Sequence, residues 1–187
     1  MKLTTAIGRE IDPGDPEHEF SVAAISTMQL LREVTYGLSL VHRFSGQLGP
    51  LTVAQHSVGV SSFFNSEEDL SGARLALIHD ASEAYLGDVP TPLKRILPEY
   101  QRLELRYEEA IYARLLGGWP GDEIARVKEA DQRAFQNEVY ALVPNQAKVR
   151  YGTDGTYTGG YTPRILWGIL QARELFYDRA IELGIAR

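Results

Sequence analysis

The chain has 187 residues, of which 44% are hydrophobic and 24% charged, as in a globular protein with one buried core, so we expect a single domain over 1–187. It contains no cysteine, which excludes disulfides and thiolate metal ligands. The net charge of -6 argues against a nucleic-acid-binding face, because such faces are basic. The polar N-terminus shows no signal peptide, and no apolar run reaches the ~20 residues of a membrane span, so we expect a cytoplasmic protein without a membrane segment.

The first third of the chain is predicted to be irregular at its start and helical after that. Residues 1–20 contain proline and glycine breakers and are expected to be irregular. Helices are predicted over 21–41 and 52–64, each capped by the hydroxyl side chain of its first residue. Residues 44–51, with two glycines and a proline, are predicted to form the loop between them.

The rest of the chain is also predicted to be helical. Apolar spacing predicts helices over 71–86, 122–143 and 164–183, and from Pro98 to the glycine pair at 117–118. Residues 87–98 are proline-rich and are expected to be a rigid, mostly non-helical connection. Residues 144–163 read as a long loop, either a functional lid or contact surface or a mobile excursion. No alternating strand pattern is evident, so we predict an all-α fold, a bundle of about six or seven helices.

One segment concentrates polar groups within an apolar stretch. His79 and Asp80 are adjacent, and Glu83 follows one helical turn later, so their side chains are expected to share one side of a helix. Carboxylates are rarely buried without a partner, and a metal ion would compensate their charge. The alternative is an exposed helix face paired with arginine and lysine.

Two further polar residues stand in apolar helices. His56 has valine neighbours and Asp131 lies in the middle of a predicted helix, where aspartate has poor propensity. Either can be a structural residue, but helical proteins also build metal sites from inward polar groups on facing helices. Two nitrogen and two oxygen ligands suit one divalent Co, Mn, Zn, Ni or Fe ion, which promotes hydrolysis.

Three segments carry a resemblance to the HD-domain phosphohydrolase superfamily. They are HRFSGQ (42–47), VAQHSV (53–58) and IHDASEAYLGDVPTPLK (78–94), followed by Asp131. Together they look like the bacterial 5′-deoxynucleotidases and the phage dATP triphosphohydrolases, and the resemblance runs from about 24 to 143. It implies a helical HD-domain bundle and an enzyme that hydrolyses deoxynucleoside phosphates with one divalent metal ion, or with Mg and a triphosphate.

The resemblance also implies a role for individual residues. The implied metal ligands are His56, His79, Asp80 and Asp131. Glu83 matches the acidic residue that positions or deprotonates the attacking water, and Asp80 is expected to be catalytic as well as a ligand. Arg43 and Lys94 match cations that bind the phosphates, and Asp88 matches an acid near the pocket. Phe44 matches an aromatic residue, typically Trp in the 5′-deoxynucleotidases, that packs against the deoxyribose. From the residues alone, Arg43 could also be a surface cation, and Lys94 could equally be a surface cation and Phe44 a core anchor.

Alternatives of other classes stay open at this point. A monophosphatase and a triphosphohydrolase need the same residues, so the sequence does not separate them. Another HD-type phosphodiesterase, or a helical module that binds a metal or nucleotide without turnover, is also compatible with the pattern. By resemblance we expect a homo-oligomer, to which the aromatic residues of 151–161 could contribute, and a deoxynucleotide as the small-molecule partner.

Overall fold

The computed structural model describes residues 2–145, 147 and 161–185, and these are mostly helical, which confirms the all-α prediction. The longer helices are α2 (Thr27–Leu40), α3 (Val53–Ser61), α4 (Leu70–Ile78), α7 (Pro98–Leu115), α8 (Glu123–Leu142) and α10 (Ile169–Glu182). The shorter elements are β1 (Leu3–Thr4), β2 (Glu10–Ile11), α1 (Pro16–Glu19), the 3-10 helix η1 (Arg43–Gly46), α5 (Glu83–Leu86) and α6 (Thr91–Lys94).

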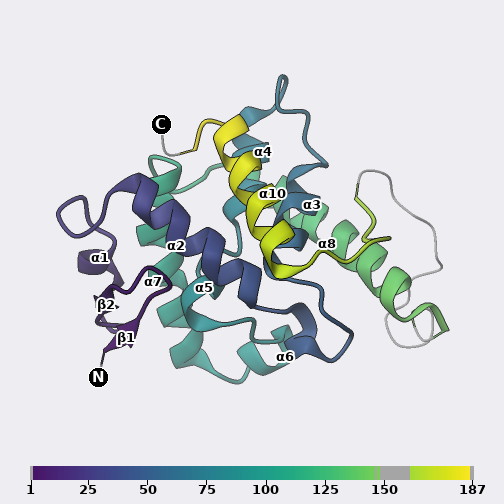
Figure 1. Cartoon of the computed structure of the whole chain (residues 1–187), viewed down its shortest axis with the longest axis horizontal. Helices are drawn as coiled ribbons and strands as arrows, with labels where there is room; N and C mark the ends of the chain where they lie inside the picture. Colours follow the sequence, from purple (N-terminus) through teal and green to yellow (C-terminus); the bar gives the residue numbers. More distant parts are fainter. Residues whose placement is uncertain (1, 146, 148–160, 186–187) are drawn as a thin grey trace.

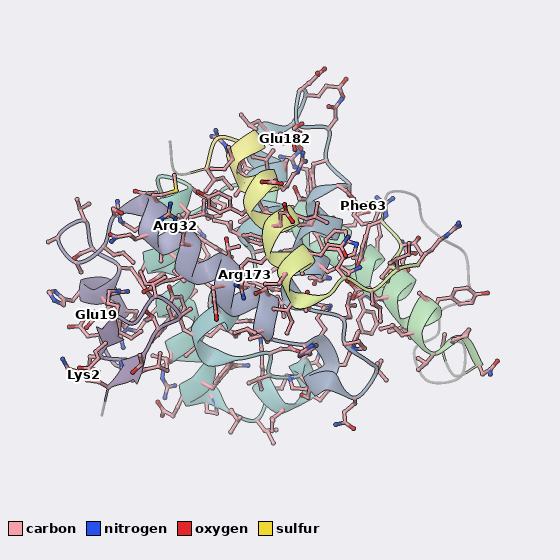
Figure 2. All side chains as sticks on the ribbon, in the orientation of Figure 1. Lys2, Glu19, Arg32, Phe63, Arg173 and Glu182 are labelled. Carbon is pink, nitrogen blue, oxygen red and sulfur yellow. The ribbon has the colours of Figure 1, made fainter. Side chains whose placement is uncertain are left out.

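The helix α3 lies at the centre of the bundle. It packs against α4, α8, α2 and α10, and α10 lies along α2 on one side of the molecule (Figure 1). Figure 2 shows Arg173 at this α2–α10 contact, where its guanidinium lies 3.7 Å from the Tyr36 ring. The buried Gln55 of α3 accepts a hydrogen bond from the Trp167 N–H at 2.9 Å and so holds the segment before α10. Because α3 is enclosed on several sides, a polar residue on it must find its partner inside the protein.

The first long helix begins later than the sequence pattern predicted. We expected Ser21 to cap it, but α2 begins at Thr27. The Ser26 hydroxyl accepts the Gln29 N–H, and the Gln29 side chain accepts the Ser26 N–H, so a capping box sets the start. Val22, which lies inside the predicted helix, precedes α2 and is 77% exposed.

Residues 2–20, expected to be irregular, contain a short hairpin and a helical turn. β1 pairs antiparallel with β2, and α1 follows. The hairpin is held to α2 by the buried Glu33. Its carboxylate accepts hydrogen bonds from Thr5, from Arg9 at 3.2 and 3.1 Å, and from Tyr85 at 2.9 Å. Three segments that are distant in sequence therefore meet at one carboxylate.

We expect Glu33→Ala to lower the free energy of unfolding by about 3 kcal/mol, because the two hydroxyls would lose their acceptor and the half-buried Arg9 guanidinium would keep only Glu19. Urea denaturation of the purified variant measures this loss. Glu10→Ala is the control, since Glu10 pairs with Lys2 at 3.9 Å on an exposed surface. Equal stability of the two variants would contradict the role given to Glu33.

The predicted helix over 71–86 is interrupted at the residues of greatest interest. α4 ends at Ile78, α5 begins at Glu83, and the four residues between them form turns. At Gly37 of α2, an added Cβ would lie 2.7 Å from the Ala84 carbonyl oxygen, so only glycine allows this approach of α5. The break turns the chain so that His79 and Asp80 lie at the end of α4, and Glu83 starts a new helix.

Other boundaries agree in part with the predictions. Pro98 is the first residue of α7 and Asp122 precedes α8, as expected. The connection 87–98 contains the short α6, and α10 begins at Ile169 rather than near 164. Within the predicted loop over 144–163, residues 144, 145 and 147 are helical, whereas 146 and 148–160 lie outside the described residues. Tyr161, expected in a subunit contact, packs against the core.

No helix in the described part of the chain combines the length and the apolar character needed to cross a membrane.

Candidate metal centre

His56 lies in α3 and is fully buried. The helix begins as predicted, with the Thr52 hydroxyl accepting the Gln55 N–H at 3.1 Å. A β-bridge between His42 and Thr52 closes the loop that precedes α3. This closure brings Arg43, at the start of η1, to the same side of the bundle as His56.

The other candidate ligands lie on two other segments of the chain. His79 and Asp80 follow the last residue of α4, and the Tyr112 hydroxyl donates to the His79 carbonyl at 2.8 Å. This contact with α7 holds the backbone of the break. Asp131 lies in α8 and is 40% exposed at its side chain. The three segments therefore converge from the middle of α3, the end of α4 and the middle of α8.

The structure brings these four side chains together. The ligand atoms of His56, His79 and Asp80 all lie within 4.8 Å of one another. An Asp80 carboxylate oxygen is 3.3 Å from His79 Nε2 and 3.7 Å from His56 Nε2. Asp131 Oδ1 lies 3.1 Å from His56 Nε2 and joins the cluster through that residue. These residues are the ones that the sequence analysis named as metal ligands.

The two imidazoles are held in the orientation that a metal site needs. Nδ1 of His56 lies 2.7 Å from a Glu138 carboxylate oxygen, and Nδ1 of His79 lies 2.9 Å from the Ala76 carbonyl oxygen. An acceptor at Nδ1 leaves Nε2 for a metal. Both Nε2 atoms are buried and make no hydrogen bond, although carboxylate oxygens lie close by. Two nitrogens and the Asp80 carboxylate face one point, with the Asp131 carboxylate next to His56, and these donors fit a divalent transition metal.

Protonation of His56 takes the place of a cation in the metal-free protein. Burial and the neighbouring Arg43 oppose a charge on this imidazole, but Glu138 and Asp131 outweigh them and raise the pKa of His56 to about 9. A metal ligand must be a neutral imidazole, so the proton leaves when an ion binds.

We therefore expect the affinity of the protein for Mn²⁺ or Co²⁺ to rise by about tenfold per pH unit between pH 6 and pH 8, levelling off above the His56 pKa. Competition with a chelator of known affinity measures this slope. His18→Gln is the control, because His18 is exposed and should leave the slope unchanged. An affinity independent of pH would contradict the assignment of His56 as a ligand.

Arg43, which we expected to reach a substrate phosphate from a loop, is engaged by acidic side chains. Its Nε donates to Glu138 at 3.0 Å, and its other nitrogens lie 3.5 Å from Asp80 and 3.9 Å from Asp131. Burial disfavours its charge, yet these carboxylates raise the pKa of Arg43 above its usual value. Arg43 therefore supplies a fixed positive charge at the edge of the candidate metal centre.

Glu83 is buried beside the cluster. Burial, followed by the charges of Asp80 and Asp88, raises the pKa of the Glu83 carboxyl well above its usual value. Lys94 lies 3.4 Å from one of its oxygens, and the other oxygen is buried without a hydrogen bond. Lys94 also donates to Glu104 of α7 at 2.5 Å. One oxygen of Glu83 is thus unengaged, as required of a group that accepts a proton.

A cavity of about 690 Å³ opens in front of these residues. It is lined by most of the residues that the sequence analysis named, namely Arg43, Phe44, Asp80, Glu83, Asp88, Lys94 and Asp131. The Phe44 ring lies 5.9 Å from the Phe135 ring, which also lines the cavity. Phe44 and Ser45 both have positive φ angles, of 58° and 51°, which residues other than glycine rarely adopt. The backbone is therefore strained at the cavity wall.

Several acidic residues near the site were not predicted from the sequence. Glu138 contacts both His56 and Arg43, and Glu104 contacts Lys94. Burial and the nearby Glu104 raise the pKa of Glu108 to about 7. One signal was present for Glu138, because it follows Asp131 by seven residues and so lies on the same face of α8. No such spacing points to the two residues of α7.

No family model matches the chain. Over 103 residues it is 38% identical to the uncharacterized protein YfdR of Escherichia coli (strain K12), a match that covers 54% of this chain and 54% of that protein. Over 111 residues it is 33% identical to the uncharacterized protein RCAP_rcc00048 of Rhodobacter capsulatus, with 56% of each covered. The chain thus spans about half the length of the curated relatives that it matches.

Proposed function

We propose that this chain is a metal-dependent phosphohydrolase of the HD-domain type that acts on deoxynucleoside phosphates. The observation that carries the proposal is the pair of buried, unbonded Nε2 atoms of His56 and His79, which face the Asp80 carboxylate beside the cavity. Buried polar atoms that make no hydrogen bond are rare, and a bound ion would use both nitrogens as ligands. The metal would be one of Co, Mn, Zn, Ni or Fe, with Mg an alternative for a triphosphate substrate.

His56, His79, Asp80 and Asp131 would hold the ion. When bound, it supplies Lewis acidity toward a phosphoryl oxygen and toward the attacking water. Glu83 would take the proton from that water at its unengaged oxygen, and the raised pKa of the Glu83 carboxyl suits a group that accepts and returns a proton. Asp80 would act both as a ligand and as the carboxylate that faces the reaction.

The cavity contains groups suited to a phosphate and to a nucleoside. Arg43 and Lys94 bring positive charge to one side of it, where they would bind phosphate oxygens. When Asp80 and Asp131 turn to the ion, the outer nitrogens of Arg43 become available for this role. Phe44 and Phe135 form an apolar wall that would pack against the deoxyribose and the base. Asp88 lies 3.5 Å from the Ser45 N–H and would help to hold the strained turn.

We also propose that the protein is cytoplasmic, forms a homo-oligomer and binds no nucleic acid. The support is the resemblance and the net charge of -6.

The decisive experiment is product analysis after incubating the metal-loaded protein with a panel of dNMPs, NMPs and dNTPs. We expect turnover of deoxynucleotides. Nucleoside and orthophosphate from deoxy monophosphates alone would identify a 5′-deoxynucleotidase. Nucleoside and triphosphate from one dNTP, such as dATP, would identify a triphosphohydrolase. Absence of turnover with Mn, Co, Mg and Zn would refute the proposal and leave another phosphoester or a binding role.

A further inference from the structure

Glu138 is fully buried in α8, and each of its two carboxylate oxygens has a different partner. One oxygen lies 2.7 Å from His56 Nδ1, and the other accepts from Arg43 Nε at 3.0 Å. These partners are 82 and 95 residues away in the sequence. The carboxylate therefore joins α3, η1 and α8 at a point directly behind the candidate metal centre.

We infer that Glu138 is a positioning residue that holds the metal ligand His56 and the phosphate-binding Arg43 in one fixed arrangement. The inference rests on the proposed function, which gives these two residues their roles. An acceptor at Nδ1 fixes the ring so that Nε2 faces Asp80 and Asp131, and it makes the imidazole a stronger ligand. The contact at Arg43 Nε fixes the guanidinium plane while its outer nitrogens extend toward Asp80 and Asp131.

A structural ion pair alone does not explain this geometry. Neutralising Arg43 requires one carboxylate in contact with the guanidinium, and both oxygens of Glu138 could serve Arg43 in a bidentate pair. Here the second oxygen is committed to the imidazole instead. The metal ligand and the phosphate ligand thus depend on the same side chain, so a change at Glu138 should weaken both functions together.

The chain provides a matched control in Glu33. It is also a buried glutamate paired with an arginine, from which it accepts two hydrogen bonds where Glu138 accepts one, and none of its described partners, Thr5, Arg9 and Tyr85, lines the cavity. Glu33→Gln and Glu138→Gln therefore make the same chemical change in similar surroundings. Only the second change is next to the candidate metal centre.

The test measures the affinity for Co²⁺ by chelator competition in the full-length wild type and in both variants. We expect Glu138→Gln to weaken Co²⁺ binding by about 10- to 100-fold. Glu33→Gln should stay within roughly twofold of the wild type, as for a distant site. Equal Co²⁺ affinities in the two variants would overturn the inference.

The second readout is the affinity of the metal-loaded protein for inorganic phosphate. Glu138→Gln should weaken it by about tenfold, and in an Arg43→Ala background it should cause no further loss. An equal loss in both backgrounds would contradict positioning through Arg43.

A third measurement needs no variant and applies even if Glu138→Gln does not fold. In the ¹⁵N spectrum of the zinc-loaded wild type, His56 should carry its proton on Nδ1 and bind zinc through Nε2. Binding through Nδ1 would overturn the inference.

These three readouts do not depend on turnover, so they test the inference separately from the proposed function. If the wild type hydrolyses deoxynucleotides and Glu138→Gln binds Co²⁺ normally, only the inference is refuted. If the wild type does not hydrolyse deoxynucleotides and Glu138→Gln binds Co²⁺ more weakly, only the proposed activity is refuted.

Discussion

Asp80→Ala is expected to remove both the bound metal and the catalytic activity. The Asp80 carboxylate lies close to both imidazoles, at 3.3 Å from His79 Nε2 and 3.7 Å from His56 Nε2, and it also faces Arg43 at 3.5 Å. Without it, the two histidines and Asp131 would remain as ligands, and the Arg43 guanidinium, with one carboxylate fewer beside it, would repel a cation. Since a metal ion contributes several kcal/mol to the stability of the transition state, the rate should fall by about 10³-fold or more.

The measurement combines metal content after gel filtration with the turnover of the best substrate. His79→Ala should behave in the same way, because it removes one of the two unbonded imidazole nitrogens. Asp122→Ala is the control, since Asp122 is exposed before α8 and makes no capping hydrogen bond. Activity retained in the Asp80 variant would rule out the proposed site.

Glu83→Gln is expected to keep the metal and to lose most of the activity. The amide has nearly the shape of the carboxylate but cannot accept the proton of the attacking water, so kcat should fall by about 10²- to 10⁴-fold. Metal content should remain that of the wild type, because Glu83 lies outside the cluster of His56, His79 and Asp80. Loss of the metal from this variant, or an unchanged kcat, would contradict the role of Glu83.

The same substitution should make the metal-free protein more stable at neutral pH. Burial and the neighbouring carboxylates raise the pKa of Glu83 well above its usual value, so ionising this carboxyl in the folded state costs free energy. This cost is absent at a pH below the pKa that Glu83 has in the unfolded chain. It grows as the pH rises above that value toward the pKa of Glu83 in the folded protein. Glu83→Gln should therefore melt at a higher temperature than the wild type at pH 8, and the difference should disappear near pH 4.

The sequence predicted the elements whose boundaries depend on neighbouring residues. Thr52 caps α3 and Pro98 opens α7, because capping and proline effects are local. The break after Ile78 was not predicted, since no glycine or proline marks it and the apolar pattern continues into Ala84. The start of the first long helix was also placed wrongly, because Ser21 was taken as the cap although Ser26, and not Ser21, has a glutamine three residues later that completes a capping box.

In the candidate site, too, some features follow from the residues themselves and others from contacts between distant segments. Spacing and residue type pointed to His56, His79, Asp80 and Asp131, and the structure brings these side chains together. The surroundings of Arg43 were not predictable, because its main partner, Glu138, lies 95 residues away. A sequence shows which side chains carry chemistry, but ion pairs between distant segments depend on how the helices cross.

The uneven burial of the four candidate ligands has a practical consequence for the purified protein. His56 is enclosed by the bundle, whereas Asp131 is 40% exposed and lines the open cavity. An ion bound there would exchange with the solution from the Asp131 side without any unfolding of α3. Which metal occupies the site would then depend on the metals present in the growth medium and in the buffers. Preparations should accordingly be stripped with a chelator and reloaded with a single metal before their rates are compared.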